Sequence, residues 1–264
     1  MKLGLLTFNM ATEWDLDEII EKCLDLGFKG VEFRNQREHA HGVEVDLSAA
    51  ERQQVRKRFE DAGLAICGLS TGCAFDAIDA EELEMNVSDA RAHLELAADL
   101  GAGGVKVYGN KAHEDEGVSR EDTIKQIGTT LAGLSDYAET LGVQVRFEMH
   151  GDFTSPEECN RIIELAGGGP GICLIYNCNN AHDVDADGSI EASYRGVAHN
   201  VGHVHVHDLA DPAFPYLEFV RLLKADDYDG WCTGELPDSP DRERVLQYFV
   251  ELWRAYETIA ELEN

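Results

Sequence analysis

Positively charged residues are scarce in this chain. Lys and Arg together number 22 against 51 Asp and Glu in 264 residues, which gives a formal net charge of −29 at pH 7. Nucleic-acid-binding proteins need clusters of Lys and Arg against the phosphate backbone, so we expect no nucleic-acid partner. The acidic residues are dispersed and form no tail, which is typical of a solvated surface adapted to high salt. We therefore interpret the chain as halophilic.

Long apolar runs are also missing. No stretch approaches the 18 residues of a transmembrane helix, so we expect no membrane partner. Residues 1–15 hold one Lys and a short apolar run without a small-residue cleavage site, which argues against a signal peptide and favours the cytoplasm. The seven cysteines form no CxxC pair, so buried free thiols are expected. Because no linker or low-complexity segment divides the chain, residues 1–264 are expected to form a single domain.

Strand-like and helix-like segments alternate along the sequence. The strand candidates are residues 3–8, 30–34, 65–70, 104–109, 143–149, 172–177, 203–209 and 231–236. Amphipathic stretches separate them; in one of these, 48–63, Ser48 and Glu51 form a capping-box pattern, and several stretches stop at a glycine such as Gly27. Eight βα units of this size predict an α/β protein with the (β/α)8 TIM barrel fold.

The alternation of apolar and polar residues predicts which strand side chains face the barrel axis. In 143-VQVRFEMH-150 the apolar set must face the helices, so Arg146, Glu148 and His150 face inward. In 203-HVHVH-207 the two valines face outward and the three histidines inward. Barrel interiors are normally filled with branched apolar residues, and a buried unpaired charge is very costly. The inward charges should therefore pair with one another, hold a metal or line a ligand pocket.

Several inward polar residues gather at the carboxyl ends of the strands, where barrel enzymes keep their sites. These residues are Arg34, Glu148, His150, Asn177, His205, His207 and Glu235. Glu148, His205 and Glu235 come from three different strand ends, and carboxylates with an imidazole suit Mn²⁺, Zn²⁺ or Mg²⁺. The agreement of three strand ends predicts a site for one divalent metal ion.

Residues deeper in the barrel have a different interpretation. Glu32 and Arg146 are expected to belong to a core ion-pair network, because they face the interior away from the strand ends. His203 lies deepest on its strand and is expected to be a core histidine with satisfied hydrogen bonds.

Three segments, 146-RFEMHGDF-153, 203-HVHVHDL-209 and 228-YDGWCTGE-235, resemble the xylose isomerase-like TIM barrel superfamily, and the resemblance covers essentially the whole chain. This superfamily contains sugar and sugar phosphate isomerases and epimerases, inosose dehydratases and endonuclease IV-type enzymes. The resemblance implies a divalent ion held by Glu148, His205, Glu235 and a strand-6 residue. That residue is usually Asp and here is Asn177, while Asn180 stands where the family has His. A neutral amide binds a hard cation more weakly, and His182 or Asp183 would be substitutes.

The resemblance also implies a reaction. In the isomerases and epimerases of the family, one Glu removes the proton next to the substrate carbonyl to give an enediolate, and the opposite Glu returns it. Glu148 and Glu235 would take these catalytic roles with help from His150. The substrate would be a sugar or polyol. Arg34, His41 and Lys106 would hold its hydroxyl groups or a phosphate, and His207 is a further expected binding residue.

Three other functions stay open at this point. A keto-polyol dehydratase would use the same enediolate chemistry and then expel a hydroxyl group. A degenerate barrel that binds sugar without turnover is supported by the two asparagines after strand 6. An endonuclease IV-like role fits poorly, because it needs a three-metal cluster and a basic face for DNA. Dimers and tetramers are common in the family, so a homo-oligomer is one expectation.

Overall fold

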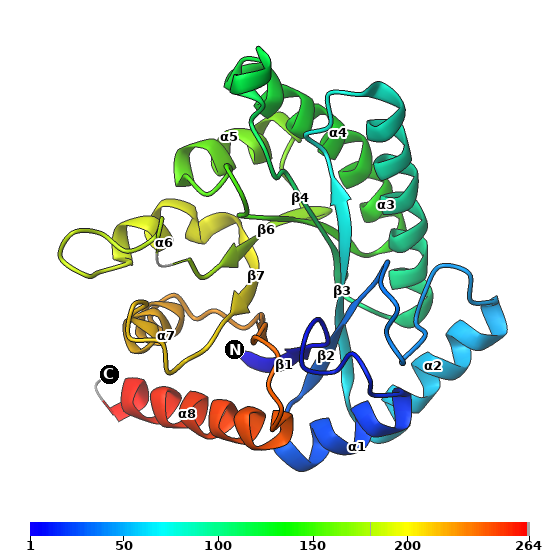
Figure 1. Ribbon diagram of the computed structural model, residues 1–264, viewed down its shortest axis with the longest axis vertical. Coiled ribbons are helices and arrows are strands. Elements are labelled where there is room, and N and C mark those ends of the chain that lie inside the picture. The colour runs from blue at the N-terminus through cyan, green and yellow to red at the C-terminus, as the bar shows by residue number, and fades with distance from the viewer. Residues whose placement is uncertain (180, 263–264) are drawn as a thin grey trace.

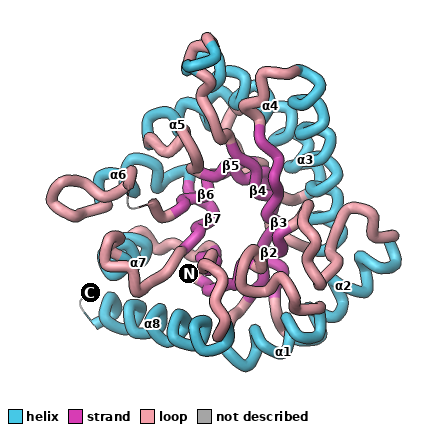
Figure 2. The backbone as a smooth tube through the Cα atoms, in the orientation of Figure 1, coloured by secondary structure: helices cyan, strands magenta, loops and turns pink. Residues whose placement is uncertain are grey.

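Eight parallel strands close into a barrel in the computed structural model, which describes residues 1–179 and 181–262 (Figures 1 and 2). Each strand pairs with its neighbours in chain order, and β1 closes the ring against β8. The strands are β1 Lys2–Leu6, β2 Gly30–Arg34, β3 Ala65–Ala74, β4 Gly104–Tyr108, β5 Gln144–Glu148, β6 Ile172–Asn177, β7 Val201–Val206 and β8 Trp231–Gly234. The predicted (β/α)8 barrel is therefore confirmed.

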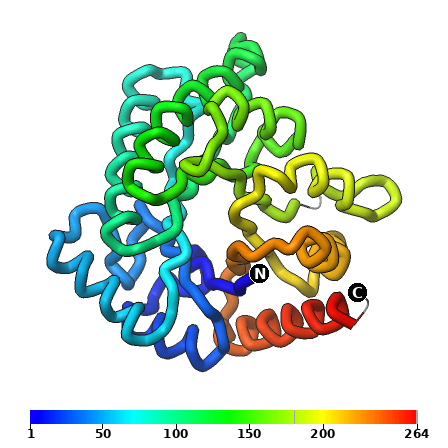
Figure 3. The backbone as a smooth tube through the Cα atoms, turned by 180° about the vertical axis from the view of Figure 1, so that it is seen from behind, coloured from blue at the N-terminus to red at the C-terminus, as the bar shows by residue number. Residues whose placement is uncertain are grey.

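The helices surround the barrel in sequence order, so that α8 packs beside α1 (Figures 1 and 3). They are α1 Leu16–Leu26, α2 Ala49–Ala62, α3 Ala80–Leu100, α4 Arg120–Leu141, α5 Pro156–Leu165, α6 Glu191–Val197, α7 Tyr216–Ala225 and α8 Arg242–Leu262, with short 3₁₀ turns η1 Glu114–Glu116 and η2 Ala198–Asn200. The capping box of Ser48 and Glu51 forms at the start of α2, and Gly27 ends α1 with φ 93°. Within the described ranges, no helix has the length and apolarity needed to cross a membrane.

The predicted strand 203–209 is displaced toward the C-terminus relative to the observed β7, Val201–Val206. The observed β7 begins at Val201 and includes Gly202, a residue that usually weakens a strand. A Cβ atom at this position would lie 2.5 Å from the Sγ atom of Cys173, so glycine allows β6 and β7 to approach closely. At its other end β7 stops at Val206, so His207 lies after the strand.

The apolar core lies between the strands and the helices, as the alternation predicts. Val145, Phe147, Val204 and Val206 are fully buried on the outer faces of β5 and β7. All seven cysteines are buried and free, which confirms the expectation from their spacing. The inner face of the barrel holds a second, polar core, and this core positions the candidate site.

Candidate metal centre and ligand cavity

The deeper part of the polar core is a hydrogen-bond network, called here the lower layer: Glu32, Arg146, His203 and Thr233. An Arg146 Nη1 group donates to His203 Nδ1 over 3.0 Å and to the carbonyl oxygen of Cys67 over 2.9 Å. Because arginine can only donate, His203 Nδ1 accepts, and its Nε2–H donates to Glu32 Oε2 over 2.9 Å. Thr233 Oγ1 donates to the same oxygen over 2.7 Å. His203 is therefore a satisfied core histidine, as expected.

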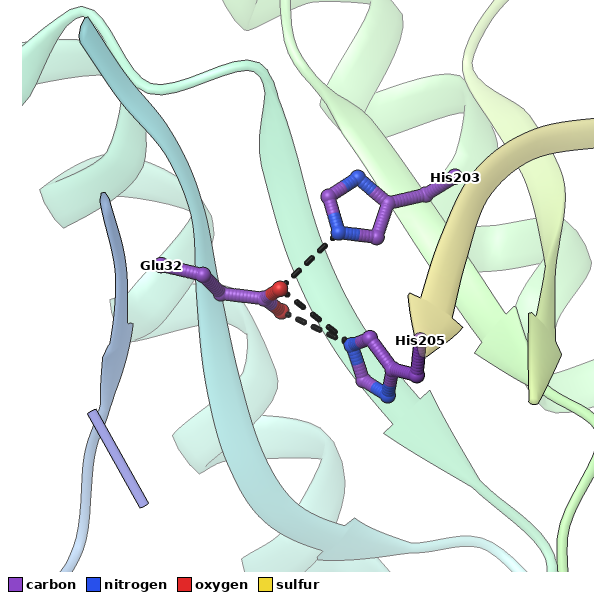
Figure 4. Close-up of side chains that lie close together, drawn as sticks. All are labelled: Glu32, His203 and His205. Atoms are coloured by element: carbon purple, nitrogen blue, oxygen red, sulfur yellow. Dashed lines mark hydrogen bonds and ion pairs between the residues drawn. The ribbon is translucent and has the colours of Figure 1, made fainter. Parts of the chain in front are cut away.

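His205 belongs to the upper layer, which also contains Lys106, Glu148 and Glu235. Its Nδ1 lies 2.7 Å from Glu148 Oε1 and 3.4 Å from Glu235 Oε2. Its Nε2 lies 3.2 Å and 3.3 Å from the two carboxylate oxygens of Glu32. Figure 4 shows the Glu32 carboxylate lying between the two imidazole rings. Since both ring nitrogens face carboxylate acceptors, both donate, and the ring is an imidazolium.

In the upper layer, burial and charged neighbours shift the pKa of each buried group in opposite directions. Burial by itself would lower the pKa of His205, but the charges of Glu32 and Glu148 outweigh it and raise that pKa to about 10. Burial would raise the pKa of Glu148, but Lys106 and His205 hold it well below its ordinary value. The Lys106 ammonium lies 2.7 Å from Glu148 Oε2. The Glu148 carboxylate is therefore ionised although it is almost completely buried.

The upper layer offers a set of metal ligands. Glu148, His205 and Glu235 each present one donor atom, and these atoms lie within 4.8 Å of one another. Glu148 ends β5, His205 lies in β7 and Glu235 follows β8, so three strand ends converge as the sequence predicts. Two carboxylates and one imidazole fit Mn²⁺, Zn²⁺ or Mg²⁺. Glu32, His203 and His205 also lie within this distance. Because Nδ1 of His203 accepts from Arg146, the nitrogen that faces Glu32, Nε2, carries the ring proton and offers no lone pair to a metal.

Asn177 ends β6 and lies against His207. The Oδ1 atom of Asn177 is 2.6 Å from His207 Nε2, and His207 Nδ1 donates to the carbonyl oxygen of Glu235 over 3.0 Å. The two suggested substitutes do not reach this place. Asp183 is buried and accepts hydrogen bonds from Asn179 N and Ser193 Oγ, while His182 is exposed. Asn180 lies outside the described residues.

A cavity of about 250 Å³ opens above the upper layer. It is lined by Phe8, Arg34, Arg37, Ser70, Lys106, Tyr108, Glu148, His150, Asn177, His207 and Glu235. His205 forms no part of the wall because it is fully buried beneath it. His150 packs its ring against Tyr108, with 4.9 Å between centroids, and its Nδ1 has no hydrogen-bond partner within the described structure. The structure thus brings most of the predicted site residues to one cavity.

His41 is the exception among these residues. It is buried, packs against Phe33 and His39, and accepts a hydrogen bond from the backbone of Val43 at its Nδ1. Burial, together with the nearby His39, lowers the pKa of His41 to about 3. Its expected contact with substrate is corrected here, because the loop after β2 turns His41 into the protein and away from the cavity.

Sequence reasoning missed Phe8, Arg37 and Ser70 as wall residues. Phe8 falls in the predicted strand 3–8, but the observed β1 ends at Leu6, so Phe8 lies in the following turn, and Arg37 lies in the loop after β2. Strand alternation does not indicate the direction of a side chain at such positions. Ser70 lies within β3, and its small polar side chain carries no charge or ring that indicates a binding role. Tyr108 shares the inward face of β4 with Lys106, so its position follows from alternation.

The comparisons with known proteins agree with this fold. A family model described as xylose isomerase-like TIM barrel matches residues 20–256. No curated protein matches the chain. A structure of 3-keto-D-glucoside 4-epimerase from E. coli superposes with a TM-score of 0.77 at 16% identity, covering 98% of this chain and 99% of the other.

Two further solved structures are similar. L-ribulose 3-epimerase superposes with a TM-score of 0.80 at 17% identity, covering 99% of this chain and 96% of the other. D-psicose 3-epimerase with D-tagatose, from Clostridium cellulolyticum H10, gives a TM-score of 0.78 at 14% identity, covering 97% and 99%. At these identities the solved structures establish the fold alone. The family model spans most of the sequence, and the chain belongs to the xylose isomerase-like TIM barrel family.

Proposed function

We propose that this protein is a divalent-metal-dependent isomerase or epimerase of a sugar or sugar derivative. The observation that carries the proposal is the approach of two carboxylates, Glu148 and Glu235, to one imidazole nitrogen of His205 at the floor of a cavity. The similar solved structures are those of sugar epimerases, which supports the choice of substrate.

Glu148, Glu235 and Nδ1 of His205 would hold the metal, with the Asn177 amide oxygen as a neutral fourth ligand. When bound, a divalent ion polarises a substrate carbonyl and acidifies the neighbouring C–H bond. Nδ1 of His205 must release its proton to become a ligand, and Glu32 then keeps the remaining proton on Nε2. The donor set fits a hard or borderline cation, and the missing carboxylate at Asn177 lowers its affinity.

The two glutamates differ in their surroundings, which suits opposite roles in proton transfer. The side chain of Glu148 is 3% exposed and paired with Lys106, whereas that of Glu235 is 19% exposed. One carboxylate removes the proton next to the carbonyl to give an enediolate, and the other returns a proton. His150, whose Nδ1 has no partner in the described structure, would bind a substrate hydroxyl during this exchange.

The test combines metal content with proton exchange. Protein purified without chelator should contain one equivalent of Mn or Zn by elemental analysis, and Glu148→Gln should lose it. In D₂O with a panel of ketoses and inososes, the parent should exchange the proton next to the carbonyl. Glu148→Gln should reduce this rate by about 10²–10⁴-fold.

Glu157→Gln is the matched control, because Glu157 is exposed on α5, and it should behave as the parent. A metal-loaded parent that exchanges no proton with any substrate would reject the isomerase. Release of water from a polyol substrate would assign the dehydratase reaction, which uses the same site.

Sugar binding without turnover is the second candidate function. The hydrogen bond between Asn177 and His207 favours this function, because it occupies the amide oxygen that would otherwise be a ligand for a cation. This alternative predicts saturable sugar binding and no exchange in D₂O, even with Mn²⁺ in excess.

A further inference from the structure

Two arginines at the cavity wall have no carboxylate partner within the described residues. Arg34 ends β2, and its Nη1 donates to the backbone carbonyl oxygens of Asn35 and Ser70, the latter over 2.9 Å. Arg37 lies in the loop that follows β2, and its guanidinium makes no hydrogen bond to the described part of the chain. Neither guanidinium has a carboxylate oxygen within 4.0 Å among residues 1–179 and 181–262.

This arrangement is unexpected in a chain with 51 acidic and 22 basic residues. Most Lys and Arg side chains contact a carboxylate, and even the nearly buried Lys106 pairs with Glu148 over 2.7 Å. Arg34 is only 8% exposed, and a buried guanidinium that no carboxylate contacts is costly. The charges of Glu44, Glu148 and Glu235 act on it only from beyond ion-pair distance. Burial, followed by repulsion from Arg37, lowers the pKa of Arg34, and the negative charges of Glu148 and Glu235 only partly oppose this change. Because both guanidinium groups line the cavity, an anionic ligand there can reach them.

Phe8 holds the two guanidinium groups on one side of the cavity. The Cζ atoms of Arg34 and Arg37 lie 5.4 Å and 6.0 Å from the centroid of the Phe8 ring. Such contacts fix the orientation of a guanidinium and leave its N–H groups free to donate at the edge. Paired guanidinium groups suit carboxylate and phosphate, which accept two parallel hydrogen bonds.

The charges of the cavity wall point in the same direction. Arg34, Arg37 and Lys106 are cationic, whereas only Glu148 and Glu235 are anionic. A divalent ion in the upper layer would increase the positive excess. A neutral sugar would leave this charge uncompensated, and a cavity of about 250 Å³ has room for a single sugar unit.

We propose that Arg34 and Arg37 form an anion subsite, and that the substrate is a keto-sugar derivative carrying a carboxylate or a phosphate group. This inference rests on the proposed isomerase function for the sugar part of the ligand. The anionic group would lie against β2 and its loop, while the sugar carbonyl would face the upper layer on β5, β7 and β8.

The test is calorimetric titration of the purified protein at constant ionic strength with D-fructose, D-fructose 6-phosphate and D-fructuronate. We expect at least one anion to bind about tenfold or more tightly than D-fructose, because charge-assisted hydrogen bonds are strong. The preferred anion identifies the group as phosphate or carboxylate. Arg37→Gln, at an exposed position that tolerates substitution, should reduce anion affinity to the level of D-fructose and leave D-fructose unchanged.

Arg91→Gln is the matched control. Arg91 also lacks a carboxylate partner in the described structure and lies over an aromatic ring, Tyr137, but it is on α3 outside the cavity. It should leave all three affinities unchanged. Arg34→Gln, whose fold is checked by circular dichroism, should also reduce the affinity for the preferred anion.

Equal or weaker binding of both anions, no binding of any of the three ligands, or an anion preference that survives Arg37→Gln would overturn the subsite. The outcome is separable from that of the proposed function. Anion preference without proton exchange in D₂O would reject the isomerase and keep the subsite, whereas exchange of neutral ketoses without any anion preference would do the reverse.

Discussion

His203 and His205 lie two residues apart on β7, face the same side of the barrel and are both completely buried. Nevertheless, their pKa values move in opposite directions. Burial, with help from Arg146, lowers the pKa of His203 to about 4, although Glu32 opposes this change. For His205, the charges of Glu32 and Glu148 overcome burial and raise the pKa to about 10.

The difference lies in the partner at Nδ1. His203 receives a proton donor from Arg146 at this atom, whereas His205 faces the carboxylate of Glu148. The first arrangement gives a neutral ring with hydrogen bonds at both nitrogens, and the second gives a charged ring whose Nδ1 proton a metal ion can replace. Burial alone therefore does not decide the charge of a histidine, because the sign of its neighbour does.

The largest expected effect comes from breaking the lower layer. Arg146→Met removes the donor to the Cys67 carbonyl oxygen and to Nδ1 of His203, the ring that in turn donates to the buried Glu32. We expect a loss of about 3–5 kcal/mol in the free energy of unfolding, measured by urea denaturation. Arg161→Met on the exposed face of α5 should change it by less than about 0.5 kcal/mol. An Arg146→Met protein as stable as the parent would contradict the role given to this network.

The second prediction tests whether Glu32 controls metal binding through His205 without being a ligand itself. Glu32 accepts the Nε2 proton of His205, which leaves Nδ1 for a cation. Glu32→Gln can offer an amide donor there instead, and this would move the remaining ring proton to Nδ1. We expect Mn²⁺ affinity, measured by calorimetry, to fall about 10–100-fold. Glu218→Gln on α7, where the carboxylate also accepts hydrogen bonds, is the control and should bind Mn²⁺ like the parent. Unchanged Mn²⁺ affinity in Glu32→Gln would contradict the role given to Glu32.

The third prediction concerns pH in chelator-treated protein. The pKa of His205 is about 10 in the folded protein and about 6.5 in the unfolded chain. Pairing of the charged ring with Glu32 and Glu148 therefore stabilises the fold in full below pH 6.5, and this stabilisation is lost as the pH rises toward about 10. Between pH 6.5 and 8 the free energy of unfolding should fall by about 1.5 kcal/mol.

Two variants sharpen this result. His205→Gln should not show the alkaline loss. His203→Gln should keep it, because His203 is neutral in this range; its lowered pKa stabilises the fold above about 6.5 and loses that contribution as the pH falls toward about 4. If both variants lose the alkaline dependence equally, the two histidines do not differ in charge as proposed.

The smallest effect concerns the neutral residue at the end of β6. Asn177→Asp adds a carboxylate at the cavity and should increase Mn²⁺ affinity by about tenfold, measured by calorimetry. Asn110→Asp adds the same charge at an exposed position outside this cavity and should have little effect. Unchanged affinity in Asn177→Asp would mean that this side chain does not reach the metal.

Sequence reasoning succeeded where strand alternation applies and failed in the loops. The inward direction of Glu148, His203 and His205 follows from the valines and aromatic residues between them. His41 and Arg37 lie beyond the strand, where the backbone path decides direction, and only Arg37 reaches the cavity. The halophilic character, the cytoplasmic location and the oligomeric state stay predictions.

The sequence by itself determined the barrel and the inner face of each strand, because both depend on local periodicity and on the alternation of strands with helices. Only the tertiary structure decided which inward groups meet. His205 and Glu148 are 57 residues apart, and His203 and Glu32 are 171 apart, yet closure of the barrel brings them within hydrogen-bond distance. The charge of each histidine depends on that meeting, because electrostatic interactions in a buried site act across space and not along the chain.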